Sequence, residues 1–79
     1  MQTASALGDG YITLSEPISA FDGTALFDCV YVAQEGGETR IYGVYPLGDV
    51  REIHPVPFRR LDGLIEAGTA LAALGYTLA

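Results

Sequence analysis

Ala25–Leu47 reads ALFDCVYVAQEGGETRIYGVYPL, and this stretch predicts a β-hairpin. Two runs rich in Val, Ile, Tyr and Phe, residue types that suit a pleated sheet, flank the turn residues EGGET. The paired glycines at positions 36 and 37 readily adopt the positive φ angles of a tight two-residue turn. We therefore expect the rest of the chain to assemble around this hairpin.

A two-residue loop at Gly36-Gly37 also predicts which residues face each other across the hairpin. The expected cross-strand pairs are Val32 with Ile41, Tyr31 with Tyr42, Val30 with Gly43, and Cys29 with Val44. One face then carries Leu26, Val30, Val32, Ile41 and Tyr45, and the other carries Phe27, Cys29, Tyr31, Tyr42 and Val44. A shift of one residue would re-sort these lists, but both faces would stay apolar. An antiparallel sheet with one face in water alternates apolar and polar residues, and this hairpin does not.

Shorter strand patterns lie on both sides of the hairpin. Tyr11–Ser15 alternates as a strand that ends at Pro17, because proline donates no hydrogen bond to a ladder. A turn at Asp22-Gly23 would pair this strand with the hairpin. Val50–Val56 predicts a final edge strand, which the flanking prolines stop. Residues Met1–Gly10 are small and polar, and we expect a flexible tail followed by a turn.

After residue 57 the apolar period changes from that of a strand to that of a helix. The preferred interpretation is a short turn over 57–61 and a helix over about 62–74, with Asp62 as its cap and Gly75 just beyond its end. The apolar stripe of this helix consists of Leu61, Leu64, Ile65, Leu71 and Leu74, extended by Phe58.

Two points in this region stay open from sequence alone. Pro57 could be the first helical residue, although this would place Arg59 and Arg60 at the positive end of the helix dipole. The closing residues 76–79 could form an edge strand, or Tyr76 and Leu78 could pack against the core.

Together these elements predict one α+β domain over residues 1–79. Its sheet would be a three- to four-stranded antiparallel meander, with a single C-terminal helix packed on one face in two layers. A chain of 79 residues is long enough for one modest core and no more.

Composition restricts the classes of function. Ten acidic residues against four arginines give a net charge of −6, which argues against direct binding of nucleic acid. The same charge fits a protein partner with a basic surface, or serves solubility alone. One cysteine forms no internal disulfide, and no signal peptide or membrane span is present, so we expect a cytoplasmic protein.

The sequence shows no constellation typical of catalysis. A Cys29–His54 dyad would need an exposed, electropositive cysteine, whereas Cys29 lies mid-strand and His54 at a strand end. The carboxylate pair Asp62 and Glu66 shares a helix face, but such pairs are usually solvated. No metal-binding loop or phosphate-binding loop occurs. We therefore expect no enzyme, no cofactor and no metal site.

Tyrosines are the residues that favour a binding role. They combine a large apolar area with a polar tip and are enriched at interfaces. A single helix covers only one sheet face, so the other face would need a covering partner or a second copy of the chain. The arginines Arg51, Arg59 and Arg60 are either interface anchors or are neutralised by neighbouring acids. The strand tyrosines are Tyr11, Tyr31, Tyr42 and Tyr45.

In size, acidity, absence of a catalytic motif and β-then-α plan, the chain resembles small phage-encoded anti-CRISPR inhibitor proteins. The resemblance implies that the partner is a CRISPR effector subunit, whose basic nucleic-acid-binding or protein-binding surface the chain would occlude. The contact residues expected in that case are Asp28, Tyr31, Glu35, Glu38, Tyr42 and Asp49. The alternative is a homodimeric structural or accessory subunit that buries its apolar sheet face against its own copy.

Overall fold

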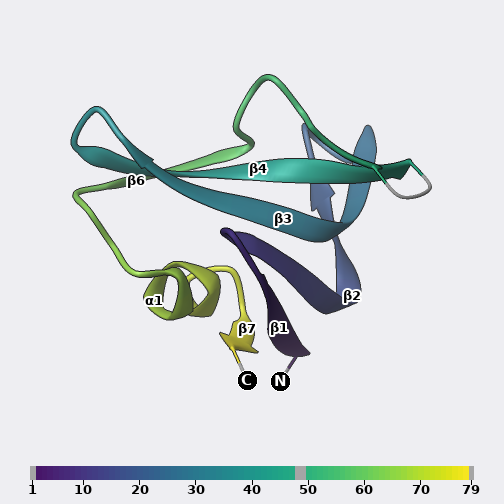
Figure 1. Cartoon of the computed structure of the whole chain (residues 1–79), viewed down its shortest axis with the longest axis horizontal. Coiled ribbons are helices and arrows are strands. Elements are labelled where there is room, and N and C mark those ends of the chain that lie inside the picture. The colour runs from purple at the N-terminus through teal and green to yellow at the C-terminus, as the bar shows by residue number, and fades with distance from the viewer. Residues whose placement is uncertain (1, 48–49, 79) are drawn as a thin grey trace.

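The computed structural model describes residues 2–47 and 50–78, and these residues form mainly β-strands. Strands β5-β4-β3-β2-β1-β7 are neighbours in that order in one sheet, and β6 pairs with β4 outside this path (Figure 1). The elements are β1 (Gln2–Gly8), β2 (Tyr11–Ala20), β3 (Ala25–Glu35), β4 (Glu38–Leu47), β5 (Val50–Ile53), β6 (Arg59–Asp62), α1 (Ala67–Ala72) and β7 (Tyr76–Leu78). The expected α+β meander of three or four strands is therefore wrong.

The central hairpin forms as the sequence predicts. Strands β3 and β4 pair antiparallel, and the register places Tyr31 opposite Tyr42 and Val32 opposite Ile41. The turn glycines Gly36 and Gly37 have φ angles of 59° and 76°, values that residues with a Cβ seldom adopt. The predicted cross-strand pairs of Val30, Tyr31 and Val32 are thus confirmed.

Strand β1 occupies residues for which we expected a tail. It pairs antiparallel with β2 and parallel with β7, so its backbone is held on both sides. Its residues are mostly small or polar, and only Ala4, with 1% exposure, is buried. Strand β2 is also longer than predicted, because it continues past Pro17 through an irregular register between Thr13 and Ile18.

The helix is much shorter than predicted. Arg59–Asp62, expected as the end of a turn and the start of a helix, instead pairs with the second edge of β4. Gly63 then adopts a φ of 84°, and Leu64, assigned to the apolar stripe, is 66% exposed. The buried Thr39 hydroxyl holds the following loop: it donates to the Gly63 carbonyl at 2.9 Å and accepts from the Ile65 N–H at 2.8 Å. These strand and loop contacts replace the first five residues of the expected helix, 62–66.

Two further expectations concern the segment after β4 and the C-terminal residues after α1. The predicted final strand over Val50–Val56 is confirmed only as far as Ile53, and it is not the last strand. Of the two alternatives for the C-terminus, both hold: Tyr76–Leu78 is a strand at the end of the sheet order, and Tyr76 is 3% exposed.

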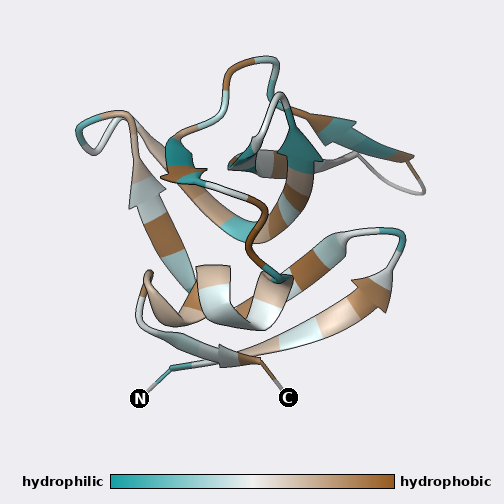
Figure 2. Ribbon diagram, turned by 90° about the vertical axis from the view of Figure 1, so that its left-hand side faces the viewer, coloured by the Kyte–Doolittle hydropathy of each residue, from teal (hydrophilic) through white to brown (hydrophobic). Residues whose placement is uncertain are grey.

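The sheet is strongly curled, so it buries parts of both faces. Strands β3 and β4 lie above α1, β1 and β7, and the molecule measures 33 × 28 × 27 Å (Figure 1). One face packs on α1, which lies within the curve of the sheet in Figure 2, and the cluster there is Ala4, Ile12, Leu14, Val30, Ile41, Ala70, Leu71 and Tyr76. On the other face Cys29 and Val44 are also buried. The flat, uncovered sheet face expected from the sequence is therefore absent from the described residues.

Candidate binding surface

Three tyrosines form a continuous row across three adjacent strands. Tyr31 on β3 lies opposite Tyr11 on β2 and opposite Tyr42 on β4. The ring centroids are 5.2 Å apart for Tyr11 and Tyr31, and 6.4 Å apart for Tyr31 and Tyr42. All three side chains are half-buried. We call Tyr11, Tyr31 and Tyr42 the tyrosine row.

Close backbone contact supports the middle ring of this row. Gly10, with a φ of 86°, lies against Tyr31, and a Cβ there would be 2.8 Å from the Tyr31 ring. The Val32 N–H donates to the Gly10 carbonyl at 3.2 Å and so ties this turn to β3. The row is therefore a preorganised surface rather than a set of loose side chains.

Arginines contact both ends of the row. The Arg51 guanidinium carbon lies 5.2 Å from the Tyr11 ring centroid, a cation–π arrangement. At the other end the Tyr42 hydroxyl interacts with Arg40, and this contact, after that of Glu38, raises the pKa of Arg40. Strands β5 and β2 are separated by β4 and β3 in the sheet order, so the Arg51–Tyr11 contact shows how far the sheet curls.

Cys29 lies beside the row and is 7% exposed. Burial raises the pKa of its thiol above the usual value, and Asp28 raises it further, whereas Arg51 lowers it. A buried thiol that stays protonated is a poor nucleophile. Asp28, the neighbour of Cys29 in β3, is exposed.

The structure brings together some of the predicted contact residues and separates others. Tyr31 and Tyr42 are adjacent, and Tyr11 joins them. Glu35 and Glu38 lie opposite each other at the end of the hairpin, where both bind Arg40, at 3.1 and 2.6 Å. The Arg40 hydrogen bond lowers the pKa of Glu38. Asp49 lies outside the described residues.

A second aromatic surface was not predicted from the sequence. His54, expected as a rim residue, lies 4.8 Å from Phe21 and 6.1 Å from Tyr45 between ring centroids. Phe27 lies beneath them, 5.2 Å from Tyr45 and 6.0 Å from Phe58. These five side chains come from four separate segments, so no local spacing signals the group. We call Phe21, Phe27, Tyr45, His54 and Phe58 the aromatic group.

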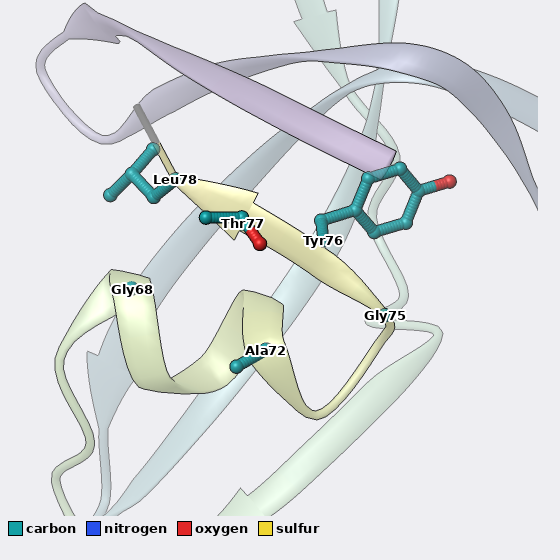
Figure 3. Close-up of a pocket in the computed structure, with 6 residues that line it drawn as sticks. All are labelled: Gly68, Ala72, Gly75, Tyr76, Thr77 and Leu78. Atoms are coloured by element: carbon teal, nitrogen blue, oxygen red, sulfur yellow. The ribbon is translucent and has the colours of Figure 1, made fainter. Parts of the chain in front are cut away.

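A hollow of about 260 Å³ lies between α1 and β7 (Figure 3). Its shape follows from small residues on the helix, because Gly68 and Ala72 face β7 across the gap. The lining residues are Gly68, Ala72, Gly75, Tyr76, Thr77 and Leu78. The lining carries no charged side chain that would select a ligand.

Three further observations bear on the class of site. Among residues 2–47 and 50–78, no group of three His, Cys, Asp or Glu side chains is placed to hold a metal ion. The one helix in that part of the chain is too short to cross a bilayer. Comparison with protein-family models, curated proteins and solved structures gives no significant match.

Proposed function

We propose that the chain is a non-enzymatic binding domain that contacts a larger protein through the tyrosine row. The observation that carries this proposal is the in-register alignment of Tyr11, Tyr31 and Tyr42 on three adjacent strands, half-buried and bounded by arginines. Tyrosine and arginine, together with tryptophan, are enriched among energetically dominant interface positions. Rings already fixed by the sheet lose little conformational entropy when a partner covers them.

The partner proposed for this surface is a protein with basic groups. The whole chain carries a net charge of −6, which speeds encounter with a positive surface. Asp28, exposed on β3, adds a carboxylate that forms no ion pair among the described residues. A cytoplasmic location belongs to the same proposal, and its support is the absence of paired cysteines.

Inhibition of a CRISPR effector subunit is the narrower form of this proposal. Its support is the resemblance in size, acidity and absence of a catalytic motif. The β-then-α plan that formed part of the resemblance does not hold, because α1 is six residues long and strands lie on both sides of it.

The test is affinity capture from the native host followed by binding measurements on the purified partner. Tyr31→Asp places a charge in the middle of the row, and we expect it to lower affinity at least tenfold. The matched control is Thr69→Asp, which adds the same charge at an exposed position of α1. Circular dichroism of both variants establishes that the fold is retained, and Tyr42→Ser tests the row without adding charge.

Equal loss of affinity in Tyr31→Asp and Thr69→Asp would contradict the assignment of the row, because a general charge effect would then explain both. The molar mass of the purified chain, measured by light scattering after size-exclusion chromatography, distinguishes a monomer that binds another protein from the homodimer alternative. A tight dimer that Tyr31→Asp dissociates would assign the row to self-association instead. Capture that is lost after nuclease treatment would point to nucleic acid and overturn the proposal.

A further inference from the structure

The aromatic group presents ring surface at a place where three segments meet. Phe21 belongs to the turn between β2 and β3, Tyr45 to β4, and His54 to the segment after β5. Phe27 is 1% exposed and forms the floor, whereas Tyr45 is 39% exposed. The Val56 N–H donates to His54 Nδ1 at 3.1 Å and fixes the orientation of the imidazole. The rings above Phe27 therefore form a rigid, partly open surface.

The backbone at Phe21 is held in an unusual conformation. Phe21 and Asp22 have φ angles of 53° and 57°, in the left-handed region that bulky residues rarely occupy. Such a conformation is strained and persists where the surroundings of the residue hold it. Here the Thr24 hydroxyl donates to the Phe21 carbonyl at 2.7 Å, and the Phe21 ring packs on His54. An Asn-Gly pair would form this turn with less strain, so the turn retains an aromatic ring at a conformational cost.

Carboxylates without ion pairs adjoin these rings. Glu52 lies directly opposite Tyr45, so the two side chains share a face of the β4–β5 pair. Asp22 follows Phe21 in the turn, and both acids are exposed. Neither forms an ion pair with any described residue. Arg51, which precedes Glu52 in the sequence, contacts Tyr11 instead. The surface therefore offers ring faces and negative charge with no internal cation.

We propose that the aromatic group docks a lysine or arginine side chain from an extended basic segment of another protein. A cation over the face of an aromatic ring is attracted by the quadrupole of the ring. A neighbouring carboxylate adds an ion pair with the same cation. The tyrosine row takes no part, so this inference does not rest on the proposed function.

The test is an NMR titration of the isotopically labelled full chain with a probe peptide. The probe is an acetylated and amidated peptide of alternating arginine and glycine, and the control peptide carries citrulline, which is neutral, in place of arginine. We expect saturable shift changes at Tyr45, Glu52 and His54 with the arginine peptide. The citrulline peptide should give at least threefold weaker binding.

A matched pair of variants, together with a third, tests whether the peptide binds at the aromatic group. Glu52→Gln removes the carboxylate next to Tyr45 and should weaken the arginine peptide about threefold to tenfold. Glu66→Gln removes one exposed negative charge before α1 and should leave affinity unchanged. Phe21→Leu keeps an apolar side chain but removes the ring, and it should also weaken binding.

Several outcomes would overturn the inference. Shift changes that fail to saturate, or that spread evenly over all acidic residues, would indicate nonspecific attraction to a negative protein. Equal losses of peptide affinity in Glu52→Gln and Glu66→Gln would also indicate nonspecific attraction. Shifts confined to Tyr11, Tyr31 and Tyr42 would assign the basic segment to the tyrosine row and leave the proposed function intact.

Discussion

At the scale of single residues, Gly43 and the Phe27 ring pack so closely that no Cβ fits between them. Gly43 lies opposite Val30 in the hairpin, and a Cβ built on it would overlap the Phe27 ring. The ring itself is 1% exposed and packs on Tyr45 and Phe58, so it has no free space into which to move.

We therefore expect Gly43→Ala to destabilise the fold by about 1–3 kcal/mol, the usual cost of overpacking a core. The measurement is urea denaturation, read as the free energy of unfolding. Gly8→Ala is not a suitable control, because Gly8 has a φ of 96° and any Cβ there is strained. An unchanged midpoint in Gly43→Ala would show that the Phe27 ring is mobile.

A second residue-scale prediction concerns pH. Glu38 binds Arg40 at 2.6 Å, and this contact holds the pKa of its carboxyl below the usual 4.5. Because the folded pKa is lowered, the contribution to stability is present above the unfolded value of 4.5 and is lost as pH falls through the folded pKa. We expect the melting temperature of Glu38→Gln to lie below that of the natural chain at pH 7. At pH values below the folded pKa of Glu38, the two melting temperatures should be equal.

The control for that series is Glu66→Gln, which removes an exposed carboxylate that forms no ion pair among the described residues. Its melting temperature should stay close to that of the natural chain over the same range. A constant difference between Glu38→Gln and the natural chain at every pH would contradict an ionic origin.

At the scale of elements, α1 is short and contains a glycine that its backbone does not need. Gly68 lies in the first turn, has no positive φ, and a Cβ there would be 3.8 Å from Leu78, which is ordinary contact. Gly68→Ala should raise the free energy of unfolding by about 0.5–1 kcal/mol, because alanine restricts the unfolded chain and favours helix. Urea denaturation measures the gain, and destabilisation would show that the hollow between α1 and β7 must stay open.

Element prediction from the sequence succeeded where pairing is local. The β3–β4 hairpin, its glycine turn and its register follow from residues adjacent in the chain. The turn at Asp22-Gly23 was found for the same reason. The predicted tyrosine contact pair, Tyr31 and Tyr42, rests on that register and is adjacent in the structure.

The sequence misled where distant contacts override local preference. The stripe beginning with Leu61 and Leu64 has helical spacing, yet β4 has a second edge that Arg59–Asp62 pairs with. The hydroxyl of Thr39 then captures the loop at Ile65, a contact 26 residues apart that no periodicity reveals. Strand β1 was missed because its small residues have weak strand preference and gain their structure from β2 and β7. The aromatic group, collected from four segments, was missed for the same reason.

At the scale of the whole molecule, the first and last strands meet. Strand β7 pairs parallel with β1, and Tyr76 packs in the core while its hydroxyl donates to the Glu16 carbonyl at 2.9 Å. This contact joins residues 60 positions apart and links the C-terminal segment to β2. The integrity of the curled sheet thus depends on a residue close to the end of the described chain.

Tyr76→Ala should therefore destabilise the whole domain by about 3–5 kcal/mol, as expected for removing a large buried ring. A domain of this size has little reserve, so we expect loss of cooperative unfolding in a thermal melt. Tyr76→Phe keeps the ring and removes only the hydrogen bond, at a cost of about 1 kcal/mol. Similar losses in the two variants would mean that the hydrogen bond, rather than packing, holds β7.

The contact of Arg51 with Tyr11 and the pairing of Glu52 with Tyr45 place β5 between the two surfaces. Arg51 and Glu52 are consecutive residues of β5, and their side chains serve opposite faces of it, one at the tyrosine row and the other at the aromatic group. Separate isotope or spin labels on these two residues would consequently report on the two surfaces one at a time.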